Sequence, residues 1–198
     1  MQARTSDLRS RRREQTRTEI VRTAFALFGR DGYENVSMEA IAAACGVSRA
    51  TLFNYFPQKN LLLCDIAAAR VAKLKAITAQ FAASGETPSF DRVAALMLKL
   101  AAENARIAAH SKKLLLATLF QQASQGLLLA AREDAVGVLA TSMRRMPGRR
   151  KPARLAADAL FAVFLATMLE WLMRESAPPS WLNDRMKERL QTLKEGVA

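Results

Sequence analysis

Histidine, cysteine, glycine and proline are all scarce in this chain of 198 residues, which has one His, two Cys, eight Gly and six Pro. A single His excludes a metal site that needs two histidines. Cys45 and Cys64 are too few for a disulfide framework in a chain of this length, and they favour a reducing compartment. The shortage of Gly and Pro argues against an all-β fold with many turns. Alanine and leucine dominate instead, and both favour helix.

Long hydrophobic runs are also missing. The first 19 residues contain no apolar core of the kind that a secretory signal requires. The longest uncharged stretch, residues 114–131, includes three glutamines, and the most apolar stretch, residues 159–169, is only 11 residues long. A helix that spans a bilayer needs about 20 apolar residues. We therefore expect a soluble, cytoplasmic protein that does not enter a membrane.

Signatures of catalysis and of metal binding are absent from the sequence as well. It contains no G-x-S-x-G, H-E-x-x-H, glycine-rich phosphate loop or paired-cysteine motif. Its carboxylates are scattered and do not share an apolar setting. We expect a protein that is not an enzyme and that uses no metal and no cofactor.

Positive charge is present in excess: 30 Lys and Arg against 18 Asp and Glu leave a formal net charge of +12 and a pI near 10.5. Such a charge favours a polyanionic partner, either nucleic acid or an acidic membrane surface. The densest basic runs are residues 9–13 and 144–151. The first is either a solvated arm or a segment that lies along DNA. The second we interpret as a solvated segment.

Residues 14–56 carry the pattern of a helix-turn-helix. Apolar residues recur at helical spacing over residues 14–30. Ser37 is a good N-cap for a short second helix. The tripeptide Gly-Val-Ser at residues 46–48 predicts a tight turn, and a third short helix follows it and ends before Pro57. Two short helices joined by a glycine-containing turn are typical of this DNA-binding motif.

Further helical segments fill the rest of the chain, and no segment has the pattern of a strand. The expected helices cover residues 58–81, 89–109, 111–123, 126–146, 152–174 and 179–197. The predicted fold class is all-α, with an N-terminal three-helix helix-turn-helix domain followed by a six-helix bundle for ligand sensing and dimerisation. The expected boundaries are a basic arm at 1–13, a DNA-binding domain at 14–62 and a regulatory domain at 63–198.

Residues 17–62 closely resemble the DNA-binding domain of the tetracycline-repressor (TetR) family of transcriptional regulators. The residues that carry the resemblance are the stretch IVRTAFALFGRDGYENVSMEAIAAACGVSRATLFNYFPQKNLLL. It contains, in order, an apolar first helix, a G-Y-x-x-V-S connection, an A-x-x-x-G-V-S turn and an F-P-x-K exit. The match covers about a quarter of the chain, and the second domain of that family varies greatly in sequence.

The third helix is the candidate DNA reader, because a short helix fits the major groove and its N-terminal part meets base edges. Its inward residues are expected to be Leu52 and Phe56. The outward residues are the candidate base contacts: Arg49 suits guanine, Asn54 suits adenine and Ala50 suits a thymine methyl group.

Hydroxyl and amine groups close to this helix are suited to phosphate oxygens. The candidates are Ser37, Thr51, Tyr55 and Lys59, and the resemblance assigns matching positions to these roles. Ser37 can equally be only a helix cap, and Tyr55 can be a core residue. Phe53 is a departure, because the family often has Tyr at this position and a phenyl ring donates no hydrogen bond. It can pack instead on a sugar or a thymine methyl group.

A regulator also needs a sensor, and residues 65–198 offer more apolar surface than a linker requires. The candidate ligand-contacting residues are Met97, Glu103, His110, Phe120, Phe161, Phe164 and Met168. Each of them can instead be an ordinary core residue. The effector that the resemblance implies is a largely apolar small molecule with one polar group. The helices over 152–174 and 179–197 are expected to pair with their copies in a two-fold homodimer.

Together these features predict a sequence-specific, ligand-responsive repressor that binds a palindromic operator in double-stranded DNA as a dimer. Two third helices would reach half-sites about 34–36 Å apart, or a multiple of that distance. The effector would shift the fourth helix and so change their separation. Two alternatives stay open. A non-specific architectural DNA-binding protein explains the charge but not the outward Arg49 and Asn54, and a helical protein of a membrane surface also fits the charge.

Overall fold

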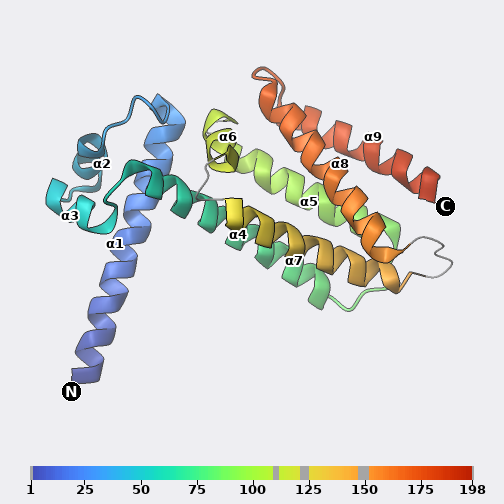
Figure 1. The fold of residues 1–198 in the computed structure, drawn as a ribbon, viewed down its shortest axis with the longest axis horizontal. Coiled ribbons are helices and arrows are strands. Elements are labelled where there is room, and N and C mark those ends of the chain that lie inside the picture. Colours follow the sequence, from blue (N-terminus) through green and yellow to red (C-terminus); the bar gives the residue numbers. More distant parts are fainter. Residues whose placement is uncertain (1, 109–111, 121–124, 147–151, 198) are drawn as a thin grey trace.

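The computed structural model describes residues 2–108, 112–120, 125–146 and 152–197. These residues form nine helices and no strand, which confirms the predicted all-α class (Figure 1). In chain order the helices are α1 (Gln2–Asp31), α2 (Met38–Cys45), α3 (Arg49–Tyr55), α4 (Lys59–Ala83), α5 (Phe90–Ala108), α6 (Lys112–Phe120), α7 (Gln125–Arg144), α8 (Ala153–Met173) and α9 (Pro179–Val197). Every bound lies within a few residues of the predicted segment except the start of α1.

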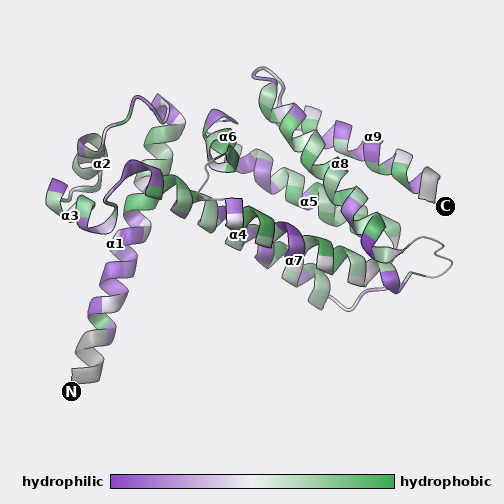
Figure 2. Ribbon diagram, viewed as in Figure 1, coloured by the Kyte–Doolittle hydropathy of each residue, from purple (hydrophilic) through white to green (hydrophobic). Residues whose placement is uncertain are grey.

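Helix α1 is longer than predicted. The prediction relied on an apolar stripe, and the N-terminal half of this helix carries none. Sequence reasoning began the helix at residue 14, whereas the structure begins it at Gln2. The described side chains of this half are exposed and mostly hydrophilic (Figure 2). Asp7 pairs with Arg11 at 3.1 Å, a spacing of four residues that supports helix. The basic run at residues 9–13 is therefore a continuation of α1.

The first three helices and the start of α4 enclose one hydrophobic core, at the left of Figure 1. Its fully buried members come from all four helices and the segment after α3: Ile20, Ala24, Phe28, Ile41, Leu52, Phe56 and Leu62. The predicted inward positions of Leu52 and Phe56 are confirmed. Cys45 is half-buried against this core, and burial raises the pKa of its thiol, which suits a small packing residue.

The turn between α2 and α3 has the geometry that its residues predict. Gly46 caps α2 with a φ of 66°, in the left-handed region that glycine enters without a Cβ penalty. The Ser48 hydroxyl caps α3 by accepting a hydrogen bond from the Thr51 amide at 3.0 Å. Helix α3 ends where Phe56 precedes Pro57 and leaves the helical conformation. Helices α2 and α3 thus form a helix-turn-helix.

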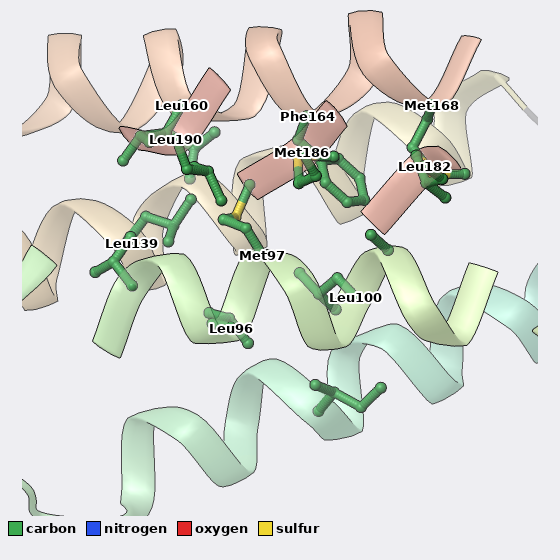
Figure 3. Packing of buried hydrophobic residues seen from close by; sticks show 14 of the residues in the cluster. Leu96, Met97, Leu100, Leu139, Leu160, Phe164, Met168, Leu182, Met186 and Leu190 are labelled. Atoms are coloured by element: carbon green, nitrogen blue, oxygen red, sulfur yellow. The ribbon is translucent and has the colours of Figure 1, made fainter. Parts of the chain in front are cut away.

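Helices α5, α7, α8 and α9 enclose a second, larger core with the end of α4. Figure 3 shows apolar side chains that α5, α8 and α9 contribute to this core: Leu96, Met97, Leu100, Leu160, Phe164, Met168, Leu182, Met186 and Leu190. The apolar stripe of α9 is therefore buried within the subunit, whereas the pairing of the helices over 152–174 and 179–197 with their copies stays a prediction. An amphipathic helix has one apolar face, and α5 and α8 cover that face of α9.

Helix α8 also keeps apolar side chains on the side away from that core, where Leu155 and Met173 are exposed. The helix has 21 residues and a mean hydropathy of 1.7 over its most apolar window. By length and composition it could cross a membrane, as core helices of soluble proteins also could. The prediction that no segment was long enough considered uncharged runs only, whereas the apolar length of α8 includes the charged residues Asp158 and Glu170.

Two helices take part in both cores. Helix α4 places Leu62 in the first core and Ile77 in the second. Helix α6 places Leu114 in the first core and Leu115 in the second. Each of these helices therefore connects the two cores.

Candidate DNA-binding surface and effector cavity

Helix α3 presents one face to solvent. Leu52 is buried beneath it, whereas Arg49, Ala50 and Asn54 are exposed. The helix has seven residues, about 10 Å at 1.5 Å per residue, which fits a major groove about 12 Å wide. All three candidate base contacts are therefore free to meet base edges when this helix lies in the groove.

Two neighbouring side chains contact the guanidinium of Arg49. Its Nε lies 3.0 Å from Glu39 Oε1 on α2, and its guanidinium carbon lies 5.4 Å from the ring centroid of Phe53. The side chains of Arg49 and Glu39 are 70% and 54% exposed, so this ion pair is weak in water and can be exchanged for a base. Phe53, which lacks a hydroxyl, thus supports the guanidinium with its ring face.

Two of the hydroxyl groups expected to contact phosphate, those of Ser37 and Thr51, lie at helix caps. Ser37 Oγ accepts a hydrogen bond from the Ala40 amide at 3.0 Å, and Thr51 Oγ1 lies 2.8 Å from Ser48 Oγ. Ser37 is exposed and Thr51 is half-buried. A hydroxyl that accepts from an amide keeps its own proton to donate. Ser37 can therefore cap α2 and contact a phosphate at the same time.

Tyr55 and Lys59 lie near the end of α3 and are each half-buried. The guanidinium carbon of Arg13 lies 5.9 Å from the Tyr55 ring centroid. Lys59 Nζ lies 4.2 Å from the Tyr33 ring centroid and donates to the Glu34 carbonyl oxygen at 3.4 Å. Lys59 therefore also connects the start of α4 to the loop before α2, a structural role that sequence reasoning missed.

Arg17 of α1 is a further positioning residue that sequence reasoning missed. It donates two hydrogen bonds to the Asp65 carboxylate of α4, at 2.7 Å and 2.9 Å. Its guanidinium carbon also lies 4.6 Å from the ring centroid of Phe56, directly after α3. The hydrogen bond to Asp65 raises the pKa of Arg17, so the guanidinium stays charged at neutral pH. One side chain thus connects α1, α4 and the end of α3.

A cavity of about 460 Å³ lies among α4, α5, α6, α7 and α8, and its described wall is mainly apolar. Four of the candidate ligand-contacting residues line it: Phe120, Phe161, Phe164 and Met168. Met97 and Glu103 are not among the residues that line it, because Met97 is fully buried in the second core and Glu103 pairs with Arg106 at 2.9 Å. His110 lies outside the described residues.

Polar residues that line the cavity were missed from the sequence. The buried ones are Arg70, Thr78 and Asn104. Thr78 Oγ1 donates to the Lys75 carbonyl oxygen at 2.9 Å, and Asn104 Nδ2 donates to the Leu100 carbonyl oxygen at 2.8 Å. In the sequence each has the context of an ordinary polar residue on a helix. Only the packing of α4 and α5 against their neighbours turns them inward.

Comparison with known proteins decides the family. A sequence profile described as bacterial regulatory proteins, tetR family, matches residues 20–66. The HTH-type transcriptional repressor KstR of Mycobacterium tuberculosis is 30% identical over 180 residues, which cover 87% of this chain and 78% of KstR. The chain belongs to the TetR family. Its membership confirms the predicted function as a DNA-binding transcriptional regulator and does not favour the architectural alternative.

Solved structures of similar proteins share the fold of this TetR regulator. The TetR-family repressor FadR of Thermus thermophilus, in complex with lauroyl-CoA, has a TM-score of 0.62 and 26% identity, over 92% of this chain and 95% of FadR. SmeT, in complex with triclosan, has a TM-score of 0.70 and 18% identity, over 90% of this chain and 89% of SmeT. The N-terminal helix-turn-helix and the helical second domain are thus the family arrangement, as predicted.

Proposed function

We propose that this TetR regulator is a ligand-responsive repressor, without enzymatic activity, that binds a palindromic operator as a homodimer in the cytoplasm. The exposed face of α3 carries the proposal, because Arg49, Ala50 and Asn54 stand on it together above the buried Leu52. These residue types suit guanine, thymine and adenine edges in the major groove. An architectural protein that contacts phosphates alone has no need of such a face.

Residues around that face supply the phosphate contacts in this proposal. The proposed contacts are Ser37, Thr51, Tyr55 and Lys59, with Phe53 supporting Arg49. The exposed basic run at residues 9–13 adjoins Tyr55 through Arg13. It would lie along the DNA beside the half-site and add sequence-independent affinity. The DNA-binding domain in this proposal is residues 14–62, with residues 1–13 as the basic arm.

The regulatory domain, residues 63–198 in this proposal, supplies the effector cavity and the dimer face. The mainly apolar wall of the cavity supports a largely apolar effector, and the FadR relative was solved in complex with lauroyl-CoA. Helix α4 extends from the first core to this cavity. An effector that shifts α4 would change the separation of the two α3 helices, and a coupling of about 1–3 kcal/mol is enough to release the operator.

Selection of bound fragments from the source genome by the purified protein tests the proposal. We expect a few fragments that share a two-fold symmetric site, with half-sites about 34–36 Å apart or a multiple of that. Unrelated DNA at moderate salt should compete poorly, because binding through phosphates alone collapses as salt rises. Retention of all fragments alike, or equal competition by unrelated DNA, would refute a sequence-specific repressor.

A further inference from the structure

Arg70 is a buried cation on the wall of the effector cavity. It lies on α4 and is only 9% exposed. Its Nη1 donates to Thr118 Oγ1 of α6 at 3.3 Å, and its buried Nε has no hydrogen-bond partner among the described residues. A guanidinium has five N–H donors. The described residues therefore leave at least the Nε donor of this guanidinium without a partner.

The two other cations that line the cavity in the described part of the chain already have carboxylate partners. Lys75 Nζ lies 2.6 Å from Asp134 Oδ2, and Arg132 Nη2 lies 2.7 Å from Asp158 Oδ1. The described residues that line the cavity include no Asp or Glu. Burial lowers the pKa of Arg70 to about 10, so its guanidinium still carries a charge at neutral pH.

An unpaired buried charge is costly for a protein to retain. An anion that enters the cavity removes that cost, and the remaining wall is mainly leucine and phenylalanine. A volume of about 460 Å³ lies within the range of about 300–1,000 Å³ for small-molecule sites. The cavity therefore complements a molecule with an apolar body and one anionic end.

We propose that the effector is an apolar carboxylic acid whose carboxylate pairs with Arg70. This inference rests on the proposed function, because it names the effector class for the same cavity. The planar guanidinium fork matches a carboxylate with two parallel N–H donors. A carboxylate also neutralises a single cation in full, whereas a phosphate monoester carries a charge of about −1.5 to −2 and would leave an uncompensated negative charge in an apolar cavity.

The position of Arg70 connects the acid to the DNA-binding helices. Thr118, which accepts from Arg70, lies on α6, and the same helix places Leu114 in the first core. A carboxylate that pairs with this guanidinium therefore acts on the side chain that joins α4 to α6. These are the two helices that take part in both cores, so the acid acts where the core of the DNA-binding helices meets the cavity.

Calorimetric binding of the full chain to acids and to their methyl esters tests the inference. The probes are hexadecanoic acid, which is linear, and abietic acid, which has fused rings, each with its methyl ester. We expect at least one acid to bind about tenfold or more tightly than its ester, since a charge-assisted pair replaces a neutral contact. Which of the two acids binds shows whether the apolar part of the effector is linear or made of fused rings. Arg70→Met should bind acid and ester alike, and Arg70→Lys should keep part of the preference.

Arg132→Met is the matched control, because it makes the same change at a cavity-lining arginine whose charge Asp158 already compensates. This variant should keep the acid preference of the original chain. Three results would overturn the inference: no binding of either acid, equal binding of acid and ester by the original chain, or an acid preference that survives in Arg70→Met. Helical circular dichroism of both variants verifies that each is folded.

Release of operator DNA separates this inference from the proposed function. If the acids bind through Arg70 but leave the operator complex intact, the result supports the inferred carboxylate site and contradicts the proposal of a ligand-responsive repressor. If acid and ester release the operator equally from the original chain and from Arg70→Met, the repressor stands and the carboxylate site fails.

Discussion

Arg49 is the residue whose loss should separate base reading from phosphate contact. Its guanidinium is exposed and its ion pair with Glu39 is weak, so Arg49→Ala should leave the fold intact. Operator binding should weaken by about 1–3 kcal/mol, and the preference at one base pair of each half-site should relax. Titrations against operators that are each changed at one base pair measure both effects. A loss of affinity with every preference intact would contradict the base-reading role.

Lys59 should behave differently, because its amine suits a phosphate. Lys59→Ala should weaken binding to all sequences alike and should lower the slope of log affinity against log salt by about one. The structure adds a second effect, since the amine packs over the Tyr33 ring. The free energy of unfolding should therefore fall by about 0.5–1 kcal/mol. Salt titrations and thermal melts measure the two effects, and an unchanged salt slope would show that Lys59 has the structural role alone.

Replacement of Arg70 should stabilise the protein in the absence of ligand. Burial lowers its pKa in the folded state to about 10, well below the usual value of a guanidinium, so at neutral pH the folded state bears a desolvation cost that the unfolded chain does not. Arg70→Met fills the space without a charge and should raise the free energy of unfolding by about 1–3 kcal/mol. The cost is fully present below the folded pKa and shrinks as the guanidinium deprotonates above it.

Urea denaturation at neutral pH measures this change in the absence of any ligand. A lower stability of Arg70→Met would mean that the hydrogen bond to Thr118 holds α4 to α6 more strongly than the buried charge destabilises the pair. Arg132→Met again provides the comparison, because its carboxylate partner offsets its charge and its loss should not stabilise the fold.

Individual residues of the candidate site could be predicted from the sequence where the amphipathic pattern of a helix alone shows that they are exposed. Arg49 and Asn54 follow from the amphipathic pattern of α3, since Leu52 and Phe56 mark the opposite face. Arg17 and Arg70 could not be predicted, because each depends on a partner 48 residues away in sequence. No local pattern distinguishes such a residue from a solvated arginine on a helix.

Lysine at the start of α6 anchors this helix on the end of α8. Lys112 Nζ donates to the carbonyl oxygens of Trp171, Arg174 and Ala177 at 3.2 Å, 2.7 Å and 2.6 Å. The last carbonyl groups of a helix lack partners within it, and a cation there also favours the helix dipole. Lys112→Met should therefore lower the free energy of unfolding by about 1–3 kcal/mol, as measured by urea denaturation.

Lys113→Met is the matched control for that variant. Lys113 pairs with Glu175 at 2.9 Å, but their side chains are 82% and 76% exposed. Surface pairs of this kind contribute little, so the loss should stay within about 0.5 kcal/mol. Equal losses in the two variants would show that the three carbonyl contacts of Lys112 do not stabilise the fold.

Helices could be predicted from the sequence where caps and apolar stripes mark them. Ser37, Ser48 and Pro57 gave the bounds of α2 and α3, whereas the start of α1 was wrong because its hydrophilic turns carry no stripe. The stripe of α9 predicted a helix but not its partner. A stripe shows that a face is buried and does not show what buries it. The neighbour of α9 is set by how the whole bundle packs.

At the scale of the whole molecule, α4 joins the two proposed activities. It begins with Lys59 beside the loop before α2 and places Arg70 in the effector cavity. Asp65, which lies between them, accepts two hydrogen bonds from Arg17, whose guanidinium packs over Phe56 at the end of α3. In the proposed mechanism, a shift of α4 at the cavity would therefore reach α3 through this charged pair as well as through the first core.

The outer face of α8 predicts where two copies meet. Leu155, Ala162 and Met173 are exposed on it in the single chain, and an apolar face on a core helix favours a cover. Ala162→Arg places a charge there and should yield a monomer with much weaker operator binding, since both α3 helices must engage together. Ala95→Arg, on the exposed side of α5, should remain a dimer. Analytical ultracentrifugation distinguishes them, and a dimeric Ala162→Arg would place the interface on another face.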